Sequence, residues 1–210
     1  MDPIAAPASV PVPQLLVSID GNIGAGKSTV MEYIHKNVGM AVNLEQVDNW
    51  MPYLERVYKH DDGVFDLQVR VWLDRCFIKR PTHGTVLVER SPMFQAGVFV
   101  PVNAEKFTPN QAAILKDMYA LPDIMSPDVY IYLRSDPAKC AERINHRARE
   151  SEDSIPIKYL NEIHLLHEAT YMEALADNKQ IAVIDIEGKS VATIAAQVLE
   201  SIYHVVNNRQ

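Results

Sequence analysis

A glycine-rich run near the start of the chain has the residue types and the spacing of a loop that binds phosphate groups. The run from Gly21 to Ser28 fits the pattern G-x-x-x-x-G-K-[ST]. Its glycines let backbone N–H groups turn toward a polyphosphate, and a following helix adds the partial positive charge of its amino terminus. In such a loop Lys27 would reach the outer phosphates and the Ser28 hydroxyl would bind Mg²⁺. We therefore predict that a nucleotide contacts this set: Gly21, Asn22, Gly24, Ala25, Gly26, Lys27, Ser28 and Thr29.

Two acidic residues follow apolar runs that have the length of strands. Glu45 comes after the run 40–44, and Glu89 comes after the run 84–88 and precedes Arg90. A carboxylate beside a terminal phosphate could take the proton of an attacking hydroxyl, which is the role predicted for Glu45. Glu89 could hold Mg²⁺, and Arg90 could neutralise charge on a transferred phosphoryl group. Taken alone, these residues also fit a solvated loop glutamate and a surface ion pair.

A third group of candidates is the basic cluster Arg143, Arg147 and Arg149, which precedes a polar, acidic stretch at 150–154. Guanidinium groups suit phosphate oxygens, so the cluster reads as a lid that closes on a triphosphate. The alternative is a solvated helix face whose charges are balanced by nearby glutamates.

Strands and helices alternate along the chain and would position these residues. The predicted strands cover 15–19, 40–44, 84–88, 129–133 and 181–185. The predicted helices cover 28–38, 50–59, 64–79, 108–120, 136–147, 157–177 and 191–205, with Thr108 as an N-cap. Because the strands are almost continuously apolar, the pattern predicts an α/β fold: a parallel sheet with helices on both faces.

The carboxyl ends of parallel strands are where ligands of such folds bind. That rule places four segments together: the phosphate loop, Glu45, the Glu89–Arg90 pair, and Arg134 after the fourth strand. The histidines lack the spacing of metal ligands, so we expect His164 and His167 to be packing or surface residues.

Composition narrows the class of protein. The chain has 210 residues, 48% of them hydrophobic and 22% charged, which is ordinary for a globular domain. A net charge of −7 argues against a surface that binds nucleic acid, and no apolar stretch is long enough to span a membrane. Residues 1–13 carry no Lys or Arg and are rich in Pro and Ala. We expect them to form a disordered tail on a cytoplasmic protein, the alternative being an arm packed on a neighbour.

The two cysteines, Cys76 and Cys140, lie in predicted helices far apart in the sequence. We expect buried, reduced thiols rather than a disulfide or a metal site. Residues 14–210 are predicted to form a single domain, with the lid at about 143–155.

In this combination the motifs resemble those of the deoxynucleoside kinases, the family of deoxycytidine, deoxyguanosine and mitochondrial-type thymidine kinases with insect and viral relatives. The sequence G-N-I-G-A-G-K-S at 21–28 is close to the family's phosphate loop, and Glu45-x-Val-x-x-Trp50 resembles its E-P-V-x-x-W, with Gln46 in place of the proline. Glu89-Arg90-Ser91 matches its E-R-S, and the segments 132–149 and 156–160 resemble its lid region. The matching elements run in order from residue 17 to about 171 and imply a P-loop kinase fold with an arginine-rich lid.

The resemblance also implies roles for individual residues. Glu45 would be the general base that takes the proton of the sugar 5′-hydroxyl, and Arg90 would hold that hydroxyl. Lys27 would contact the phosphate that is transferred. Ser28 and Glu89 would bind Mg²⁺. The resemblance further implies that the lid arginines clamp ATP and that the nucleoside is bound by the remaining residues: Trp50, Tyr58, Gln68, Val71, Phe99 and Glu152, of which Tyr58 and Glu152 contact the 3′-hydroxyl.

Two further residues bear on which nucleobase the protein would prefer. Arg75 falls where the deoxycytidine and deoxyguanosine branches have an arginine that pairs with an aspartate, and Gln95 stands at the position of that aspartate. A neutral amide holds an arginine less firmly than a carboxylate does and can donate or accept toward a base. We therefore expect Arg75 and Gln95 to contact the base, and expect relaxed specificity that favours pyrimidines.

The leading interpretation is ATP- and Mg²⁺-dependent phosphorylation of deoxynucleosides by a homodimer that binds neither nucleic acid nor membranes. A nucleoside monophosphate kinase, such as a thymidylate kinase, would share the fold but would not need a base like Glu45. A catalytically silent kinase-like subunit is the alternative from a different class, and loss of Lys27, Glu45 or Arg90 would have indicated it.

Overall fold

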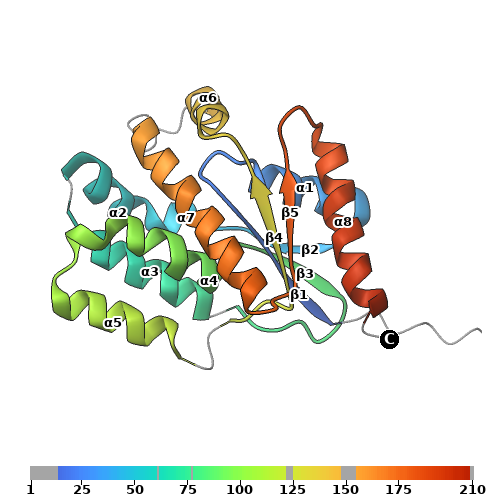
Figure 1. Ribbon diagram of the computed structural model, residues 1–210, viewed down its shortest axis with the longest axis horizontal. Coiled ribbons are helices and arrows are strands. Elements are labelled where there is room, and N and C mark those ends of the chain that lie inside the picture. Colours follow the sequence, from blue (N-terminus) through green and yellow to red (C-terminus); the bar gives the residue numbers. More distant parts are fainter. Residues whose placement is uncertain (1–13, 61, 77, 122–124, 148–154, 209–210) are drawn as a thin grey trace, which may run out of the picture.

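A sheet of five parallel strands forms the centre of the part of the chain that the structure describes. The computed structural model describes residues 14–60, 62–76, 78–121, 125–147 and 155–208. The strands are β1 (Leu15–Gly21), β2 (Ala41–Asn43), β3 (Thr85–Glu89), β4 (Val129–Arg134) and β5 (Ile181–Asp185), in the order β2-β3-β1-β4-β5. Each neighbouring pair is parallel, which confirms the predicted sheet (Figure 1).

Strand β1, which leads into the phosphate loop, and its neighbour β4 are buried along almost their whole length. Every residue of β1 is buried, and so are all but the last of β4. Strands covered on both faces read as continuous apolar runs, which is why they were recognisable in the sequence. The edge strand β2 pairs only with β3, and it is shorter than the predicted 40–44 because only Ala41–Asn43 pair with that strand.

Helices cover both faces of the sheet, as predicted. On one face lie α1 (Lys27–Val38) and α8 (Val191–Asn208), which pack on each other and on the strands (Figure 1). On the other face, α7 (Ile157–Ala176) packs against three consecutive short elements: α4 (Pro92–Phe94), the π-helix η1 (Gln95–Phe99) and the 3₁₀-helix η2 (Pro101–Lys106). The remaining helices are α2 (Val47–His60), α3 (Val64–Cys76), α5 (Pro109–Tyr119) and α6 (Pro137–Arg147).

The helix boundaries agree with the prediction except at a few ends. Helix α2 begins three residues earlier than expected, at Val47, and α3 ends at Cys76 rather than at 79. The predicted N-cap is confirmed, because Thr108 and Gln111 form a reciprocal capping box at the start of α5. The short elements between 92 and 106 were not predicted, since none is long enough to show an apolar periodicity.

The cysteines differ from the prediction at one position. Both thiols are free and Cys140 is buried, but Cys76 is exposed at the end of α3. The expected burial of Cys76 is wrong, because α3 ends at this residue and leaves the side chain exposed. The tail at 1–13 lies outside the described residues.

Close packing between η1 and α7 fixes one wall of the site and gives a stability prediction. A Cβ added at Gly97 would collide with the side chain of Thr170 on α7. We expect Gly97→Ala to lower the free energy of unfolding by about 1–3 kcal/mol because the packed core has no room for it. Urea denaturation of the single and double variants measures this. In the background of Thr170→Ala the penalty should shrink, and an equal penalty there would contradict the packing argument.

Candidate active site

The phosphate loop joins β1 to α1, and two of its glycines are required by close backbone contacts. A Cβ at Gly21 would lie 2.6 Å from the carbonyl oxygen of Leu133, and one at Gly24 would lie 2.6 Å from that of Cys140. Both residues also have positive φ angles, 148° and 78°. The loop is therefore held between β4 and α6 by close contacts within the protein.

Lys27 is the first residue of α1 and is almost completely buried beneath this loop. Its Nζ donates to the carbonyl oxygens of Gly21 and Asn22, at 3.3 and 3.0 Å. The Asn22 side chain in turn donates to the carbonyl of Leu160, which ties the loop to α7. Burial, reinforced by repulsion from Arg90, lowers the pKa of Lys27 to about 8. An anion placed at the loop would favour the charged form of this amine.

Ser28 and Glu89 bring three oxygen atoms together at the end of β3. The Ser28 hydroxyl donates to both carboxylate oxygens of Glu89, at 2.9 and 3.1 Å. Hard oxygen donors of this kind suit Mg²⁺, which usually takes one or two protein ligands and completes its shell with water and phosphate oxygens. The described residues contain no group of three or more His, Cys, Asp or Glu that could hold a metal ion by itself.

Glu45 follows β2 and is held by two arginines. Its Oε1 lies 2.8 Å from Nη2 of Arg75 and 3.0 Å from Nε of Arg90, and its backbone N–H donates to Glu89. Burial alone would raise the pKa of Glu45, but the charges of Arg90 and Arg75 outweigh it and hold the pKa below its ordinary value. The side chain therefore stays an oriented carboxylate.

Arg90 adopts a backbone conformation that is rare for any residue other than glycine, with φ of 64°. Its Nη1 donates to the Gly21 carbonyl at 2.8 Å, and its guanidinium lies 4.4 Å from the centre of the Phe99 ring. The guanidinium thus touches the phosphate loop, the Glu45 carboxylate and an aromatic wall at once. Several simultaneous contacts of this kind can hold a residue in a strained backbone conformation.

Asp20 helps to lock this turn and was not singled out from the sequence. Its Oδ1 accepts from the backbone N–H and the hydroxyl of Ser91. The Ser91 hydroxyl also accepts from the N–H of Phe94 and so caps the start of α4. Burial raises the pKa of Asp20, although Ser91 and Arg90 oppose this. The sequence signal for this role was a carboxylate within a largely apolar strand, because a buried carboxylate needs hydrogen-bond partners.

A cleft of about 560 Å³ opens from the phosphate loop and contains most of the predicted nucleoside contacts. It is lined by Trp50, Gln68, Val71, Gln95 and Phe99 together with Lys27, Ser28, Glu45, Glu89 and Arg90. Asn103 and Tyr159 line it as well, and neither was predicted from the sequence. They are hydrogen-bonded to each other, and Asn103 donates to the Phe99 carbonyl at 2.9 Å.

Two amides meet inside the cleft, whereas Arg75 pairs with a carboxylate. Gln95 Nε2 donates to Gln68 Oε1 at 2.9 Å, and Gln68 Nε2 donates to the Phe99 carbonyl at 3.2 Å. Arg75 is joined to Glu45 rather than to Gln95 and is not among the described residues that line the cleft. The predicted contacts of Arg75 and Gln95 with a base stay predictions; in the structure a buried carboxylate holds the Arg75 guanidinium, and a carboxylate does so more strongly than a neutral amide.

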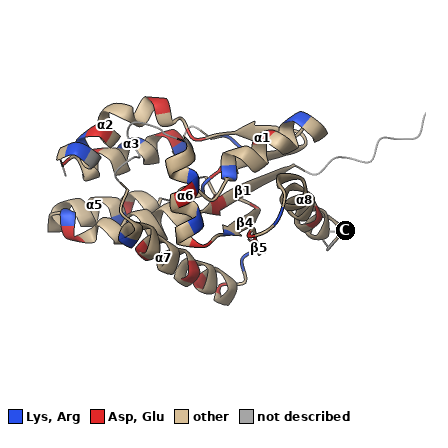
Figure 2. Cartoon of the chain, turned by 90° about the horizontal axis from the view of Figure 1, so that it is seen from above, with Lys and Arg blue, Asp and Glu red and all other residues tan. Residues whose placement is uncertain are grey.

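The lid is described only in part. On α6, Arg143 donates to the Ser135 hydroxyl at 2.8 Å and to Glu187 at 3.1 Å. Glu187, which the sequence reasoning missed, also accepts from Ser135 and so ties α6 to the loop after β5. Arg147 ends α6, but its side chain is outside the description, as is that of Tyr58 in α2. Arg149 and Glu152 lie outside the described residues. Figure 2 looks down on this end of the sheet, with α6 above the strands.

Arg134 lies at the end of β4, as expected, but its guanidinium is paired with a carboxylate of α7. Its Nε and Nη2 donate to the two oxygens of Glu168, at 2.8 and 2.7 Å. His167 is buried and stacks on Phe94 and Tyr132, which confirms its expected packing role. Both residues thus fasten α7 to the sheet.

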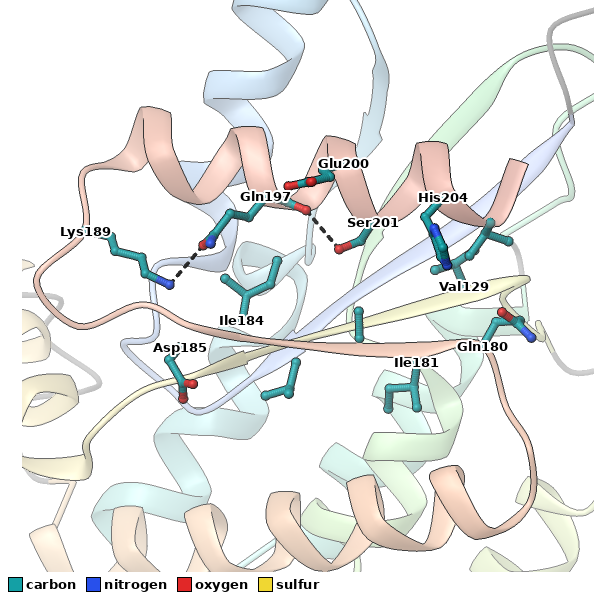
Figure 3. A pocket seen from close by; sticks show the side chains of 13 residues that line it. Val129, Gln180, Ile181, Ile184, Asp185, Lys189, Gln197, Glu200, Ser201 and His204 are labelled. Atoms are coloured by element: carbon teal, nitrogen blue, oxygen red, sulfur yellow. Dashed lines mark hydrogen bonds between the residues drawn. The ribbon is translucent and has the colours of Figure 1, made fainter. Parts of the chain in front are cut away.

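A second cavity, of about 460 Å³, runs between β5 and α8 and shares none of these residues. Figure 3 shows its polar groups bonded to one another: Lys189 donates to the Gln197 side chain, and Ser201 donates to the Gln197 backbone carbonyl. Lys27, Ser28, Glu45, Glu89 and Arg90 line the first cleft instead.

None of the helices in the described part of the chain has both the length and the apolar composition needed to cross a bilayer.

Comparisons with known proteins agree with the arrangement of this site. The family model "Deoxynucleoside kinase" matches residues 17–208. The deoxyadenosine/deoxycytidine kinase of Bacillus subtilis is 32% identical over 165 residues, which cover 73% of this chain and 75% of that protein. Human mitochondrial thymidine kinase 2 is 29% identical over 73% of this chain, a match that spans 63% of that protein.

Solved structures give the same result. Deoxyadenosine kinase from M. mycoides, solved with bound dCTP, superposes with a TM-score of 0.76 and 26% identity, covering 90% of this chain and 100% of that one. The same enzyme with bound dATP gives a TM-score of 0.74 and 25% identity, covering 90% and 99%. The phosphate loop, the Glu45–Arg90 pair and these matches lead to one conclusion: the chain belongs to the deoxynucleoside kinase family, enzymes that phosphorylate deoxynucleosides.

Proposed function

We propose that the protein transfers the γ-phosphoryl group of ATP to the 5′-hydroxyl of deoxynucleosides. The observation that carries the proposal is the convergence of Glu45 and Arg90 beside the phosphate loop. A hydroxyl bound at Glu45 would give up its proton to the carboxylate as it attacks. Arg90 would neutralise charge on the phosphoryl group in transit. Catalysis would thus rest on positioning and charge neutralisation.

The phosphate loop and its lysine would hold the nucleotide. Backbone N–H groups of the loop and Lys27 would contact the β- and γ-phosphates, while Ser28 and Glu89 would hold Mg²⁺, which neutralises phosphate charge when bound. Arg143, Arg147 and Arg149 would close over the triphosphate. The oxygen donor set at Ser28 and Glu89 supports the magnesium assignment.

The deep part of the cleft would hold the nucleoside. Trp50, Val71 and Phe99 would surround the base, and Gln68 would face its polar edge. Tyr58 and Glu152 would bind the 3′-hydroxyl. We propose broad specificity in which pyrimidine deoxynucleosides are favoured, since relatives carry names that include deoxycytidine and thymidine as well as deoxyadenosine.

We also propose that the protein is a homodimer that works in the cytoplasm. Leu165 and Met172 are exposed seven residues apart on one face of α7, which suits contact with a second copy. Free thiols at Cys76 and Cys140 suit a reducing compartment. Light scattering should give twice the chain mass of 23.6 kDa, and a value near the chain mass would contradict the dimer.

A parallel substrate assay tests the proposed reaction. The protein is incubated with ATP and Mg²⁺ and, separately, thymidine, deoxycytidine, deoxyadenosine, deoxyguanosine and dTMP. We expect monophosphates from the nucleosides, with the pyrimidines turned over fastest. Activity confined to dTMP would indicate a nucleoside monophosphate kinase, and a profile confined to deoxyguanosine would contradict the proposed preference. No activity on any acceptor would favour a catalytically silent subunit.

Titration of Lys27 gives a prediction for nucleotide binding. Because the pKa of Lys27 is lowered to about 8, this amine is only partly charged at that pH. A triphosphate would favour the charged form, so binding of MgATP at pH 8 should take up about half a proton per site, and less at pH 7. Calorimetry in buffers with different ionisation enthalpies measures the uptake. Lys27→Arg keeps the charge without titrating in this range, and an undiminished uptake in that variant would contradict the assignment.

A further inference from the structure

Asp20 is a buried carboxylate beside the phosphate loop, and the proposed reaction gives it no role. It is the residue before Gly21 on β1 and is 0% exposed. In the register of the sheet it stands beside Tyr132 of β4, so both neighbouring strands enclose it. A carboxylate in such a place is unfavourable unless hydrogen bonds compensate for its lost hydration. The hydrogen bonds that do so therefore indicate its role.

The backbone turn at Arg90 brings two successive N–H groups to β1. The Arg90 N–H donates to the Ile19 carbonyl at 3.0 Å, which continues the ladder between β3 and β1. In an extended strand the next N–H would point to the opposite side. Because Arg90 has a φ of 64°, the Ser91 N–H instead donates to Asp20 Oδ1, at 2.8 Å. The Asp20 side chain thus takes the place of a backbone acceptor where the ladder ends.

The Ser91 hydroxyl extends this contact toward the wall of the cleft. It donates to the same Asp20 oxygen at 3.1 Å and accepts from the Phe94 N–H at 3.2 Å, which caps α4. Helix α4 leads directly into η1, and the Phe99 ring at the end of η1 lies 4.4 Å from the Arg90 guanidinium. One oxygen of Asp20 therefore holds both the backbone after Arg90 and the start of the segment that carries its aromatic contact.

We propose that Asp20 is a positioning residue for Arg90: its Oδ1 holds the left-handed turn after β3 and so aims the guanidinium at the phosphate loop and at Glu45. The proposal rests on the proposed function, in which Arg90 neutralises charge on the phosphoryl group in transit. The rotamers open to a side chain depend on the φ and ψ of its backbone. If the turn relaxed, the bonds of Arg90 to the Gly21 carbonyl, at 2.8 Å, and to Glu45, at 3.0 Å, would lose their geometry.

Loss of the Asp20 acceptor should slow phosphoryl transfer without weakening nucleotide binding. Valine is close to aspartate in size and suits a buried strand, so Asp20→Val removes the acceptor with little change in packing. We expect kcat to fall about 10- to 100-fold, because a displaced Arg90 is no longer aligned with the reacting group. The dissociation constant of MgADP should change less than about threefold, since the contacts of Lys27 with the loop carbonyls do not involve the Asp20 side chain.

Asparagine at this position separates the hydrogen bonds from the charge. Both bonds from Ser91 end on one oxygen of Asp20, and an amide oxygen in its place accepts in the same way. Asp20→Asn should therefore keep at least about a third of kcat. If Asp20→Asn were as slow as Asp20→Val, the acceptor would not be what positions Arg90, and the proposal would be overturned.

A double-mutant cycle tests whether Asp20 acts through Arg90. If it does, Asp20→Val should lower kcat by less than about twofold in the background of Arg90→Lys, where the directed contacts are already lost. Equal losses in the two backgrounds would show independent effects and would overturn the proposal. Ser91→Ala removes the hydroxyl contact and the cap of α4 but keeps the carboxylate. It provides a second cycle with the same expectation if Asp20→Val does not fold.

The experiment measures kcat with ATP and the four deoxynucleosides, and the binding of MgADP by calorimetry, for these variants of the full chain. Asp128→Val is the matched control, because Asp128 accepts the Leu16 N–H near the other end of β1. It should leave kcat within about twofold, whatever it does to stability.

A fall in kcat with unchanged MgADP binding, rescued in Asp20→Asn and absent from the Arg90→Lys background, is the expected result. Weaker binding of MgADP in Asp20→Val by tenfold or more would indicate damage to the phosphate loop and would overturn the proposal, as would an equal fall in kcat in Asp128→Val. Absence of activity in the unmodified protein would instead overturn the proposed function.

Discussion

Replacing Glu45 by glutamine should lower kcat by about 10³-fold, which lies in the range measured for the loss of a general base. Glutamine has nearly the same shape and can still accept a hydrogen bond from Arg75 or Arg90. It cannot take up the proton of an attacking hydroxyl. Because the main contacts of Lys27 and Ser28 do not use Glu45, we expect the KM for ATP to change only a few-fold.

A matched variant separates this effect from a general loss of charge. Glu173→Gln on the exposed face of α7 should leave kcat within about twofold, since surface substitutions of this kind rarely matter. Circular dichroism of Glu45→Gln should show the native helix content. A kcat in Glu45→Gln close to that of the unmodified protein would show that another group takes the proton.

Replacing Arg90 by lysine should cost at least as much, about 10³-fold in kcat, although the charge is kept. The guanidinium makes two directed contacts at once, from Nη1 to the Gly21 carbonyl and from Nε to Glu45. A lysine ammonium is a compact point charge and cannot reproduce this fork. It would also lose the planar contact with the Phe99 ring.

Arg56→Lys is the control for this substitution. Arg56 lies on α2, pairs with Asp62 and Asp66, and is exposed, so the exchange should leave kcat within about twofold. Steady-state kinetics at saturating ATP and deoxynucleoside measure both variants. If Arg90→Lys retained most of the activity, charge alone would suffice and the directed contacts of Arg90 would not contribute to catalysis.

The sequence was enough to predict the features that depend on local pattern. The phosphate loop, the five strands and nearly all the long helices have short-range periodicity or fixed spacing. The position of Glu45 and Arg90 at one edge of the sheet followed from parallel topology, because strands that run the same way end at the same edge.

The features that escaped prediction depend on which side chains meet across long sequence distances. Arg75 could have faced Gln95 or Glu45, and the choice is made by the packing of α3 against the segment after β2. The Asp20–Ser91 contact likewise joins residues 71 positions apart. The π-helix at Gln95–Phe99 is a single turn, so no apolar periodicity indicates it in the sequence. Its first and last residues, Gln95 and Phe99, nevertheless line the cleft.

The most direct test of the central claim is to locate the phosphoryl group after reaction. The protein is incubated with ATP labelled at the γ-phosphate, Mg²⁺ and deoxycytidine, and the product is compared with authentic 5′- and 3′-monophosphates. Placement of the 5′-hydroxyl between Glu45 and the phosphate loop predicts label on the 5′-oxygen alone. Label on the 3′-oxygen, or release of labelled inorganic phosphate without a labelled nucleotide, would contradict it.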